Sequence, residues 1–367
     1  MLIDDIALTL QQGLGSRGIV HLLSTFEDSN EIYESSEAKL VTKSGLRADI
    51  AHQIVLKTFH RQAEEELEYM RRHGIGAVSS TNKEYPELLR YCNDYPHVLY
   101  YRGNRKVLGS KHKIAFVGTR TASAYGLSMC EILLQRLAEI CPEAVVVSGM
   151  AYGIDSHIHR AALNAKLKTI GVIANPLPDI YPAQHQRLAE DIIASGGAIV
   201  TELHSKIHMN GAYFIPRNRI IAGMSEGTVV VESPLKGGSI ATAGFADSYH
   251  RVVMAVPGRV TDKCSVGCNR LIVEQRAAMV CSADDIVREL GWDIEIPGNI
   301  PARKDVEPLL TSDEKLIVKC LSENNAAGMD MLAVKTGIPV GQISSILMNM
   351  EISGIIRSLP GKNYELV

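Results

Sequence analysis

The sequence lacks several features that mark common classes of protein. Its 367 residues contain no apolar run of the roughly 18 residues that a membrane helix needs. The first residues, MLIDDIALTL, carry two acids where a secretory signal has a basic segment. The formal net charge of −3 excludes a surface coated in positive charge but not a local basic groove. These absences predict a cytoplasmic protein that does not contact a membrane.

Metal-binding patterns are also missing. The seven cysteines are odd in number and scattered, which is typical of reduced thiols in the cytosol. Cys264 and Cys268 form a C-x3-C pair, but no second cysteine or histidine pair lies nearby. Asp155 and His159 are four residues apart on a predicted helix, and no third ligand has a compatible spacing. We therefore predict no metal site and no cofactor.

Three signatures of nucleotide binding or of catalysis are absent as well. The chain has no G-x-G-x-x-G followed by an acid about 20 residues on, and no G-x-x-x-x-G-K-[ST]. No serine, histidine and acid occupy the context of a nucleophile elbow. The acids nearest the predicted strand ends are Asp155, Glu202 and Glu232, and nothing pairs them into an acid/base dyad. The sequence thus predicts no catalytic residues.

What the sequence does contain is an alternation of short apolar runs with helical patterns. Because most runs are continuously apolar rather than alternating, they are typical of parallel strands covered on both faces. The predicted strands are 113–118, 144–149, 168–174, 198–203, 227–233 and 252–258. Helices between them predict an α/β fold, an extended Rossmann-like, doubly wound, mostly parallel sheet.

Different patterns flank this core and predict five segments. Residues 1–75 read as an N-terminal helical domain, in which QQGLGSRGIVHLL and KSGLRADIAHQIV resemble helix-hairpin-helix (SAM-like) units. The alternative is a small bundle with ordinary glycine caps. Residues 76–110 read as a connector, 111–292 as the core, and 293–308, with three prolines, as a linker. Residues 309–367 follow a winged-helix-like order, with helices near 311–322, 329–336 and 340–352 before a hairpin.

The loops after the predicted strands share one design, in which glycines, hydroxyls and cations precede the start of a helix. The carboxyl ends of parallel strands lie together at one edge of an open sheet. Glycine lets a phosphate approach the backbone, and a helix start offers free amides. We predict phosphate binding by Gly118, Thr119, Arg120, Ser123, Ser148, Gly149, Gly153, Arg217, Asn218, Arg219, Lys236, Gly238, Ser239 and Asn269.

Some of these residues have a second interpretation. Arg217 and Arg219 lie at a predicted helix start entered through Pro216, where a cation is unfavourable unless an anion lies beside it. A bound phosphate is one explanation, and ion pairs with Glu202 or Glu232 are the other. Asn269 is equally suited to a ligand or to a neighbouring loop.

Five segments, in order, carry a family resemblance: FVGTRTASAYG, VVSGMAYGIDSHIHRAAL, PRNRIIAGMS, GGSIATAGFA, and VMAVPG followed by SVGCNRLI. With YPELLRYCNDYPHVLYYRGN before them, they closely resemble the DNA-processing protein A (DprA/Smf) family. The resemblance implies a non-catalytic, homodimeric protein that binds single-stranded DNA. It also implies protection of incoming DNA and help in loading RecA during natural transformation.

The resemblance also assigns roles to residues of this chain. It places DNA against Arg120, Arg217, Arg219 and Lys236. Backbone and hydroxyl contacts would come from Gly118, Ser148, Gly149, Gly238 and Ser239. The chain departs from the family at Gly237, where a serine is usual, so one hydroxyl is lost.

Other functions remain open from the sequence. Only 5% of residues are aromatic, which is low for a protein that stacks bases. Tyr125, Tyr152 and Phe214 lie in or beside the loops and are suited to stacking or to the core. An alternative is a Rossmann-like nucleotide hydrolase similar to phosphoribohydrolases, of whose PGGxGT motif LKGGSIATAG is a partial echo. A purely structural scaffold is the third.

The C-terminal segment gives a weaker signal for nucleic acid. Its predicted recognition helix, PVGQISSILMNME, contains no lysine or arginine. Most recognition helices place such residues against bases or phosphates. Packing or protein docking is therefore expected more than duplex recognition.

Overall fold

A computed structural model describes residues 2–294, 311–324, 327–352, 355–359 and 363–366. The chain forms two compact units, residues 1–296 and residues 297–367. Nearly all of the predicted linker, 293–308, lies outside the described residues.

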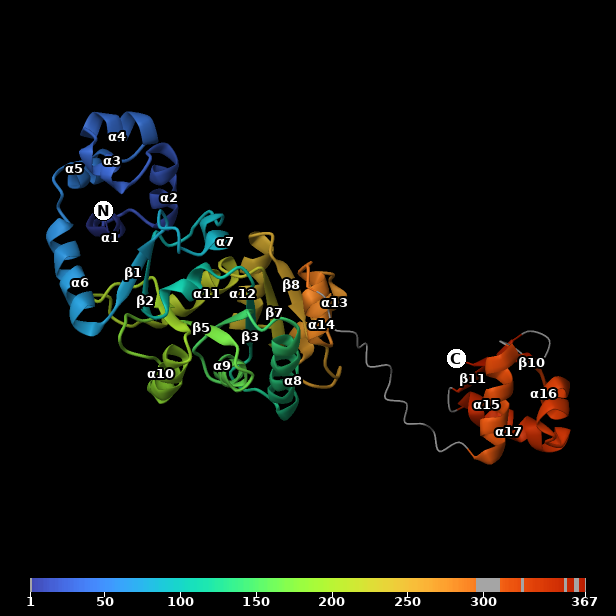
Figure 1. Ribbon diagram of the computed structural model, residues 1–367. Helices are drawn as coiled ribbons and strands as arrows, with labels where there is room; N and C mark the ends of the chain where they lie inside the picture. The colour runs from blue at the N-terminus through green and yellow to red at the C-terminus, as the bar shows by residue number, and fades with distance from the viewer. Residues whose placement is uncertain (1, 295–310, 325–326, 353–354, 360–362, 367) are drawn as a thin grey trace. The chain divides into compact units, whose positions relative to one another are not determined.

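The larger unit is built on a nine-stranded sheet (Figure 1). Its order is β1-β2-β6-β5-β4-β3-β7-β8-β9. The pairs β1/β2 and β2/β6 are antiparallel, and all other neighbours are parallel. The parallel strands are β3 (Lys113–Gly118), β4 (Val145–Gly149), β5 (Lys168–Val172), β6 (Ala198–Thr201), β7 (Gly227–Glu232), β8 (Val252–Ala255) and β9 (Ala278–Met279). The six predicted strands are all present, and the mostly parallel α/β fold is confirmed.

The strand order makes β3 the switch point of the sheet. The chain runs outward from β3 through β4, β5 and β6, then returns to place β7 on the other side of β3. In such sheets the adjacent loops diverge and leave a crevice at the carboxyl ends of the strands. The register between β3 and β7 shifts between Val117 and Gly118, so the first loop leaves the sheet at an irregularity.

Helices cover both faces of this sheet because its strands are apolar on both sides (Figure 1). One core contains residues of α7 (Glu87–Arg90), α11 (Phe214–Gly223), α12 (Gly238–Ser248) and α13 (Val266–Val273). The core of the opposite face contains residues of α8 (Ala124–Ile140), α9 (Ile154–Asn164) and α14 (Ala283–Glu289). Helix α10 (Gln186–Ala194) packs beside α9 and against β5 and β6. Short 3₁₀ turns occur at Arg105–Gly109, Ala183–His185 and Gly211–Tyr213.

The segment 76–110, expected as a connector, contributes two strands to the sheet. Strand β1 (Gly76–Ser79) pairs with β2 (Val98–Gly103), and β2 pairs in turn with β6. Between them, Tyr85 is 1% exposed in the core under α11 and donates to the carbonyl of Pro96 at 2.5 Å. This segment therefore belongs structurally to the core.

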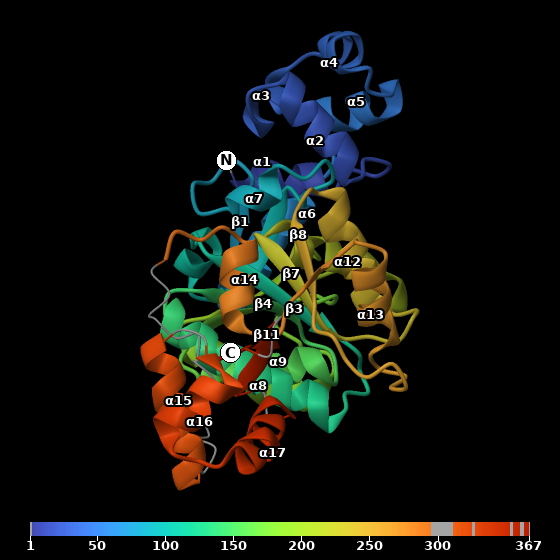
Figure 2. The same cartoon turned by 90° about the vertical axis from the view of Figure 1, so that its right-hand side faces the viewer.

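Six helices precede β1: α1 (Leu2–Thr9), α2 (Ser16–Thr25), α3 (Ser29–Glu34), α4 (Glu37–Ser44), α5 (Ala48–Val55) and α6 (His60–His73). They share one apolar cluster with Val98, Tyr100 and Ile199 of the sheet, so they belong to the same compact unit. Figure 2 shows α2 to α5 grouped beyond α1, away from the strands. Gly45 ends α4 in the left-handed conformation of an ordinary glycine cap.

The smaller unit has its own core. Its helices are α15 (Ser312–Asn324), α16 (Met329–Thr336) and α17 (Val340–Ile352), close to the predicted bounds. Strands β10 (Ala327–Gly328), β11 (Ile356–Leu359) and β12 (Asn363–Leu366) form a sheet of order β10-β12-β11. This is the predicted winged-helix order. In the described residues no single helix is long and apolar enough to cross a membrane. One helix pair, Met329–Thr336 with Val340–Glu351, is long and apolar enough when taken together, but it is bent by 111°.

Candidate functional site

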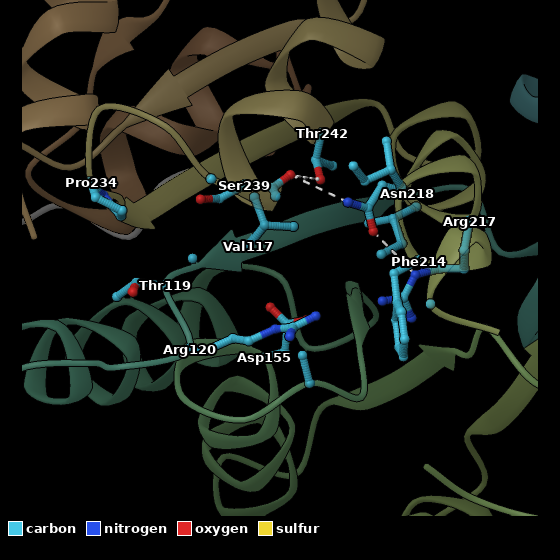
Figure 3. A pocket seen from close by; sticks show the side chains of 17 residues that line it. Val117, Thr119, Arg120, Asp155, Phe214, Arg217, Asn218, Pro234, Ser239 and Thr242 are labelled. Carbon is cyan, nitrogen blue, oxygen red and sulfur yellow. Dashed lines mark hydrogen bonds between the residues drawn. The ribbon is translucent and has the colours of Figure 1, made fainter. Parts of the chain in front are cut away.

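A cavity of about 630 Å³ lies at the switch point of the sheet. It opens between the carboxyl ends of β3, β4 and β7 and the first turns of α11 and α12 (Figure 3). The lining is Val117, Gly118, Thr119, Arg120, Ala151, Asp155, Gly211, Phe214, Ile215, Arg217, Asn218, Ile221, Pro234, Gly237, Gly238, Ser239 and Thr242. We call this the switch-point pocket.

The first loop brings an unpaired cation to the pocket. Arg120 is exposed, and its guanidinium carbon lies 5.5 Å from the centre of the Phe214 ring. No carboxylate of the described residues forms an ion pair with it. The loop itself is fixed, because the Thr119 amide donates to the carbonyl of Glu232 at 2.8 Å. Arg120 thus makes no ion pair among the described residues, although it favours the charged form of nearby Asp155, and its guanidinium is suited to an anionic ligand.

Helix α11 supplies a second arginine, which is buried. The helix begins at Phe214 rather than at Pro216, so Arg217 lies in its first turn as a helical residue. Its Nε donates to Asn218 Oδ1 at 3.1 Å, and a terminal nitrogen donates to the carbonyl of Val172. Burial lowers the pKa of Arg217 to about 10, against the opposing effect of Asp155. Arg217 remains a cation at neutral pH and adds positive charge to the pocket wall.

Asp155 is a buried acid whose charge opposes that of Arg217 in the pocket wall. It lies in the first turn of α9, after the N-cap residue Gly153. Burial raises the pKa of Asp155 to about 6, although Arg217 and Arg120 favour its charged form. A β-carbon on Gly149 would lie 2.5 Å from Asp155 Oδ2 and 2.8 Å from an Arg217 nitrogen. Glycine at 149 therefore lets both side chains reach the end of β4.

Asn218 and the start of α12 close the pocket opposite the first loop. Asn218 Nδ2 donates to the carbonyl of Gly238 at 3.3 Å, and Thr242 Oγ1 donates to the same carbonyl at 2.9 Å (Figure 3). Ser239 Oγ donates to Ser233 Oγ at 2.8 Å and is buried. These bonds fix the glycine pair Gly237-Gly238 at the pocket edge, where bare backbone faces the cavity.

The sequence analysis predicts fourteen phosphate-binding residues, and the structure divides them. It brings together at this pocket Gly118, Thr119, Arg120, Arg217, Asn218, Gly238 and Ser239. Outside the lining lie Ser123, Ser148, Gly149, Gly153, Arg219, Lys236 and Asn269. Most of the second group hold the loops rather than face the cavity.

Arg219 forms a largely buried ion pair with Glu202. Its guanidinium donates to Glu202 and lies 3.5 Å from Ser16 Oγ, with side-chain exposures of 9% for Arg219 and 19% for Glu202. Burial raises the pKa of Glu202, and Arg219 opposes that rise. Of the two interpretations of Arg219, the structure contains the ion pair with Glu202.

Ser123, Ser148 and Asn269 satisfy backbone and side-chain groups. Ser123 accepts from the Gly126 amide at 3.2 Å as the N-cap of α8, and donates to Glu232 at 2.5 Å. Ser148 donates to the Phe116 carbonyl at 2.7 Å inside the core. Asn269 bonds both the amide and the carbonyl of Gly258, at 3.1 and 2.9 Å, which is the neighbouring-loop interpretation.

The remaining predicted residues have simpler positions. Lys236 is exposed on the loop between β7 and α12. Gly153 has a φ of +75°, and its ideal β-carbon would lie 2.3 Å from the Thr119 carbonyl oxygen. Only glycine fits this contact between the second loop and the first. Gly153 thus shapes the pocket without lining it.

The structure also places the histidine considered as a metal ligand and the aromatic residues considered for base stacking. His159 is buried, bonds Thr169 and the Gly149 carbonyl, and has its pKa lowered by burial to about 4. In the described residues no group of three or more potential ligands is placed to hold a metal ion. Phe214 lines the pocket, whereas Tyr125 donates to the Pro257 carbonyl at 2.6 Å.

Sequence reasoning missed part of the lining. Helix α11 presents Phe214, Asn218 and Ile221 to the pocket, which are four and seven residues apart and share one face. Asn218 is among the predicted residues and Phe214 is a stacking candidate, whereas Ile221 was not singled out. That spacing was readable from the sequence once the helix start was placed at Phe214. Gly211 and Ile215 flank the same turn and carried no comparable signal.

The chain matches known protein families along most of its length. A family model described as DNA recombination-mediator protein A matches residues 77–291, and one described as the DprA winged helix domain matches residues 301–362. The chain is 34% identical over 313 residues to the putative DNA processing protein DprA of Mycobacterium tuberculosis, covering 82% of this chain and 79% of that protein. It is 38% identical over 236 residues to DprA of Bacillus subtilis, covering 64% of this chain and 78% of that one.

Solved structures agree. The X-ray structure of DprA from Streptococcus pneumoniae superposes with a TM-score of 0.68 at 30% identity, covering 79% of this chain and 98% of that one. A DprA structure from Helicobacter pylori, whose subject is its single-stranded DNA binding mode, gives a TM-score of 0.53 at 27% identity, covering 60% and 97%. The predicted fold class and resemblance are thereby confirmed, and the chain belongs to the DprA/Smf family of DNA-processing proteins.

Proposed function

We propose that this chain binds single-stranded DNA at the switch-point pocket and acts as a recombination mediator without catalysing a reaction. The observation that carries the proposal is the free Arg120 guanidinium beside the Phe214 ring at the mouth of the pocket. A cation that tracks phosphates, next to a ring on which a base stacks, is the combination that single-strand binding uses. The Helicobacter pylori relative, which binds single-stranded DNA, supports the same ligand.

The contacts around the pocket support binding over chemistry. Glu232 accepts two hydrogen bonds from Ser123, at 2.9 and 2.5 Å, and so is held as a structural acceptor. Asp155 is buried beside Arg217, and no serine or cysteine of the lining has a base within hydrogen-bond distance in the described residues. Without a nucleophile or a paired base, the pocket is equipped to hold phosphates.

The proposal includes the partners that family membership suggests. We infer a cytoplasmic homodimer that protects incoming DNA and helps load RecA during natural transformation. Support for a dimer is the apolar exposure at the end of α13 and in β9, where Val273 is 75% exposed and Met279 is 57% exposed. Exposed apolar side chains of this kind are suited to a protein–protein interface. Light scattering tests the dimer, and the lag of RecA-dependent ATP hydrolysis on single-stranded DNA tests loading.

A competition experiment tests the ligand class. A fluorescent oligo-dT strand is bound to the full chain, and unlabelled single strand, duplex or deoxynucleoside monophosphate is added. We expect single strand to displace the label, duplex to displace it weakly, and the monophosphate to have no effect. Release of free base from the monophosphate would instead support the nucleotide hydrolase and contradict the proposal.

A further inference from the structure

A second hollow, of about 640 Å³, lies between α9 and α10. Its polar lining consists of Arg160, Asn164, Gln184, Arg187, Asp191 and Ser195. Arg160 and Arg187 come from the two facing helices, and both are exposed. Neither forms an ion pair or hydrogen bond with another described residue. Asp191 is the single carboxylate among the lining residues, so the groove carries a net positive charge.

The position of Arg187 is itself unfavourable without a ligand. It is the second residue of α10, where the helix dipole repels a cation. Its i+4 neighbour is Asp191, but a cation preceding an acid is the weaker orientation on a helix, and the two do not pair here. An anion held by the side chains of Arg160 and Arg187 offsets the repulsion; the first amide of α10 takes no part, because the Gln186 amide donates to the carbonyl of Ala183.

Tyr152 links the groove to the residues of the switch-point pocket. Gln184 of the groove accepts a hydrogen bond from the Tyr152 hydroxyl at 2.8 Å. Tyr152 lines a small pocket together with Tyr181 and with Arg120, Phe214 and Arg217 of the switch-point pocket. Tyr152 and Tyr181 are each 46% exposed. The rings of Phe214, Tyr181 and Tyr152 therefore lie between the arginines of the switch-point pocket and those of the groove.

We propose that the groove between α9 and α10 binds phosphates of the same single strand as it leaves the switch-point pocket. The inference rests on the proposed function and extends it. Arg160 and Arg187 contact the backbone, and Tyr152 and Tyr181 offer stacking faces between the two cation pairs. An acidic protein segment would also suit two arginines. The link through Tyr152 to the ring-lined pocket favours the strand, because rings have no role in binding a run of carboxylates.

Strand length separates the two sites experimentally. The affinity of the full chain is measured by fluorescence anisotropy over a salt series, for oligo-dT of about 5 and about 16 nucleotides. The variant is R160Q/R187Q. The matched control is K83Q/K111Q, which removes two exposed lysines, one before α7 and one before β3, neither of which lines the switch-point pocket or the groove. Unchanged fluorescence of Trp292, the single tryptophan, confirms that each variant keeps its fold.

We expect R160Q/R187Q to bind the short strand like the wild type and the long strand about tenfold more weakly. The slope of log K against log salt for the long strand falls by about 1.4 units, since each phosphate contact on a single strand contributes about 0.7. The lysine control leaves both strands unchanged. R120Q weakens both lengths, because both begin at the switch-point pocket.

Three results contradict the inference in distinguishable ways. If R160Q/R187Q binds both lengths like the wild type, the groove does not hold DNA and the proposed function still stands. If that variant instead loses binding to polyglutamate alone, the groove is a docking surface for an acidic protein. If the wild type binds neither strand at low salt, the proposed function fails, and this inference fails with it.

Discussion

Replacing Gly153 with alanine tests how the second loop holds the first. Gly153 has φ +75° and ψ −127°, a conformation essentially restricted to glycine. Holding alanine there costs about 1–3 kcal/mol. Its β-carbon would also lie 2.3 Å from the Thr119 carbonyl oxygen and 2.6 Å from that of Arg120, so the first loop must retreat by about 1 Å to reach ordinary contact. Such crowding costs a further 1–3 kcal/mol, roughly.

The expected loss for Gly153→Ala is therefore about 4 kcal/mol in the free energy of unfolding. Urea unfolding followed by Trp292 fluorescence measures it. Trp292 is the single tryptophan, is 7% exposed and donates to Glu226 at 3.0 Å within the larger unit, so its signal reports on that unit. Because the retreat moves the backbone of Arg120, the affinity for single-stranded DNA falls as well.

Gly74→Ala is the matched control. Gly74 also has a positive φ, +61°, but nothing lies within 4 Å of its ideal β-carbon. That change carries backbone strain alone, about 1–2 kcal/mol, and leaves DNA affinity unchanged. Equal losses for the two variants would refute the claim that Gly153 holds the first loop by close approach.

Two further predictions concern charges near the pocket. Arg219→Gln breaks the buried pair with Glu202 and lowers the free energy of unfolding by about 3 kcal/mol, without changing the salt dependence of DNA binding. The exposed pair Arg270–Glu274 is the control, and Arg270→Gln costs under about 1 kcal/mol; a reduced salt slope for Arg219→Gln would assign Arg219 to the DNA instead. Asp155 has its pKa raised from 3.8 to about 6, so the folded state binds its proton more tightly than the unfolded state and stability falls as pH rises between these values, by about 3 kcal/mol at most. DNA affinity rises as pH falls from about 7 to about 5, because the neutral acid no longer offsets the charge of Arg217. In Asp155→Asn, both the stability and the DNA affinity depend less on pH. Identical pH titrations of stability and affinity for Asp155→Asn and the wild type would contradict this prediction.

Much of the fold was predictable because its signals are local. The six predicted strands are mostly buried apolar runs, five of them with a glycine at or beside one end, and burial on both faces means that side chains on either side of the strand can be apolar. Strands β1 and β2 were missed because Pro86 and Pro96 lie between them and because the antiparallel pairing of β2 depends on β6, about 100 residues further on. Strand β9 has two residues, too few for a pattern.

The site was half predictable for a related reason. Glycines and cations after strands do lie at one edge of the sheet, and that edge holds the pocket. Whether a given side chain faces the cavity depends on partners that are remote in sequence. Ser123 donates a hydrogen bond to Glu232 and Arg219 pairs with Glu202, so neither side chain lines the cavity. No local pattern separates these two from Arg120, which has the same kind of neighbours and no ion pair among the described residues.

The salt dependence of strand binding for wild type and Arg120→Gln tests the central claim most directly. Anisotropy of a labelled oligo-dT strand is recorded from low to high salt for both proteins, with Lys83→Gln as the control for loss of one exposed charge. The account predicts tight, salt-sensitive binding by the wild type. It also predicts weaker binding by Arg120→Gln, with a slope smaller by about 0.7 units, and no change for the control. Equal affinities and slopes for wild type and Arg120→Gln would contradict a strand held at the switch-point pocket.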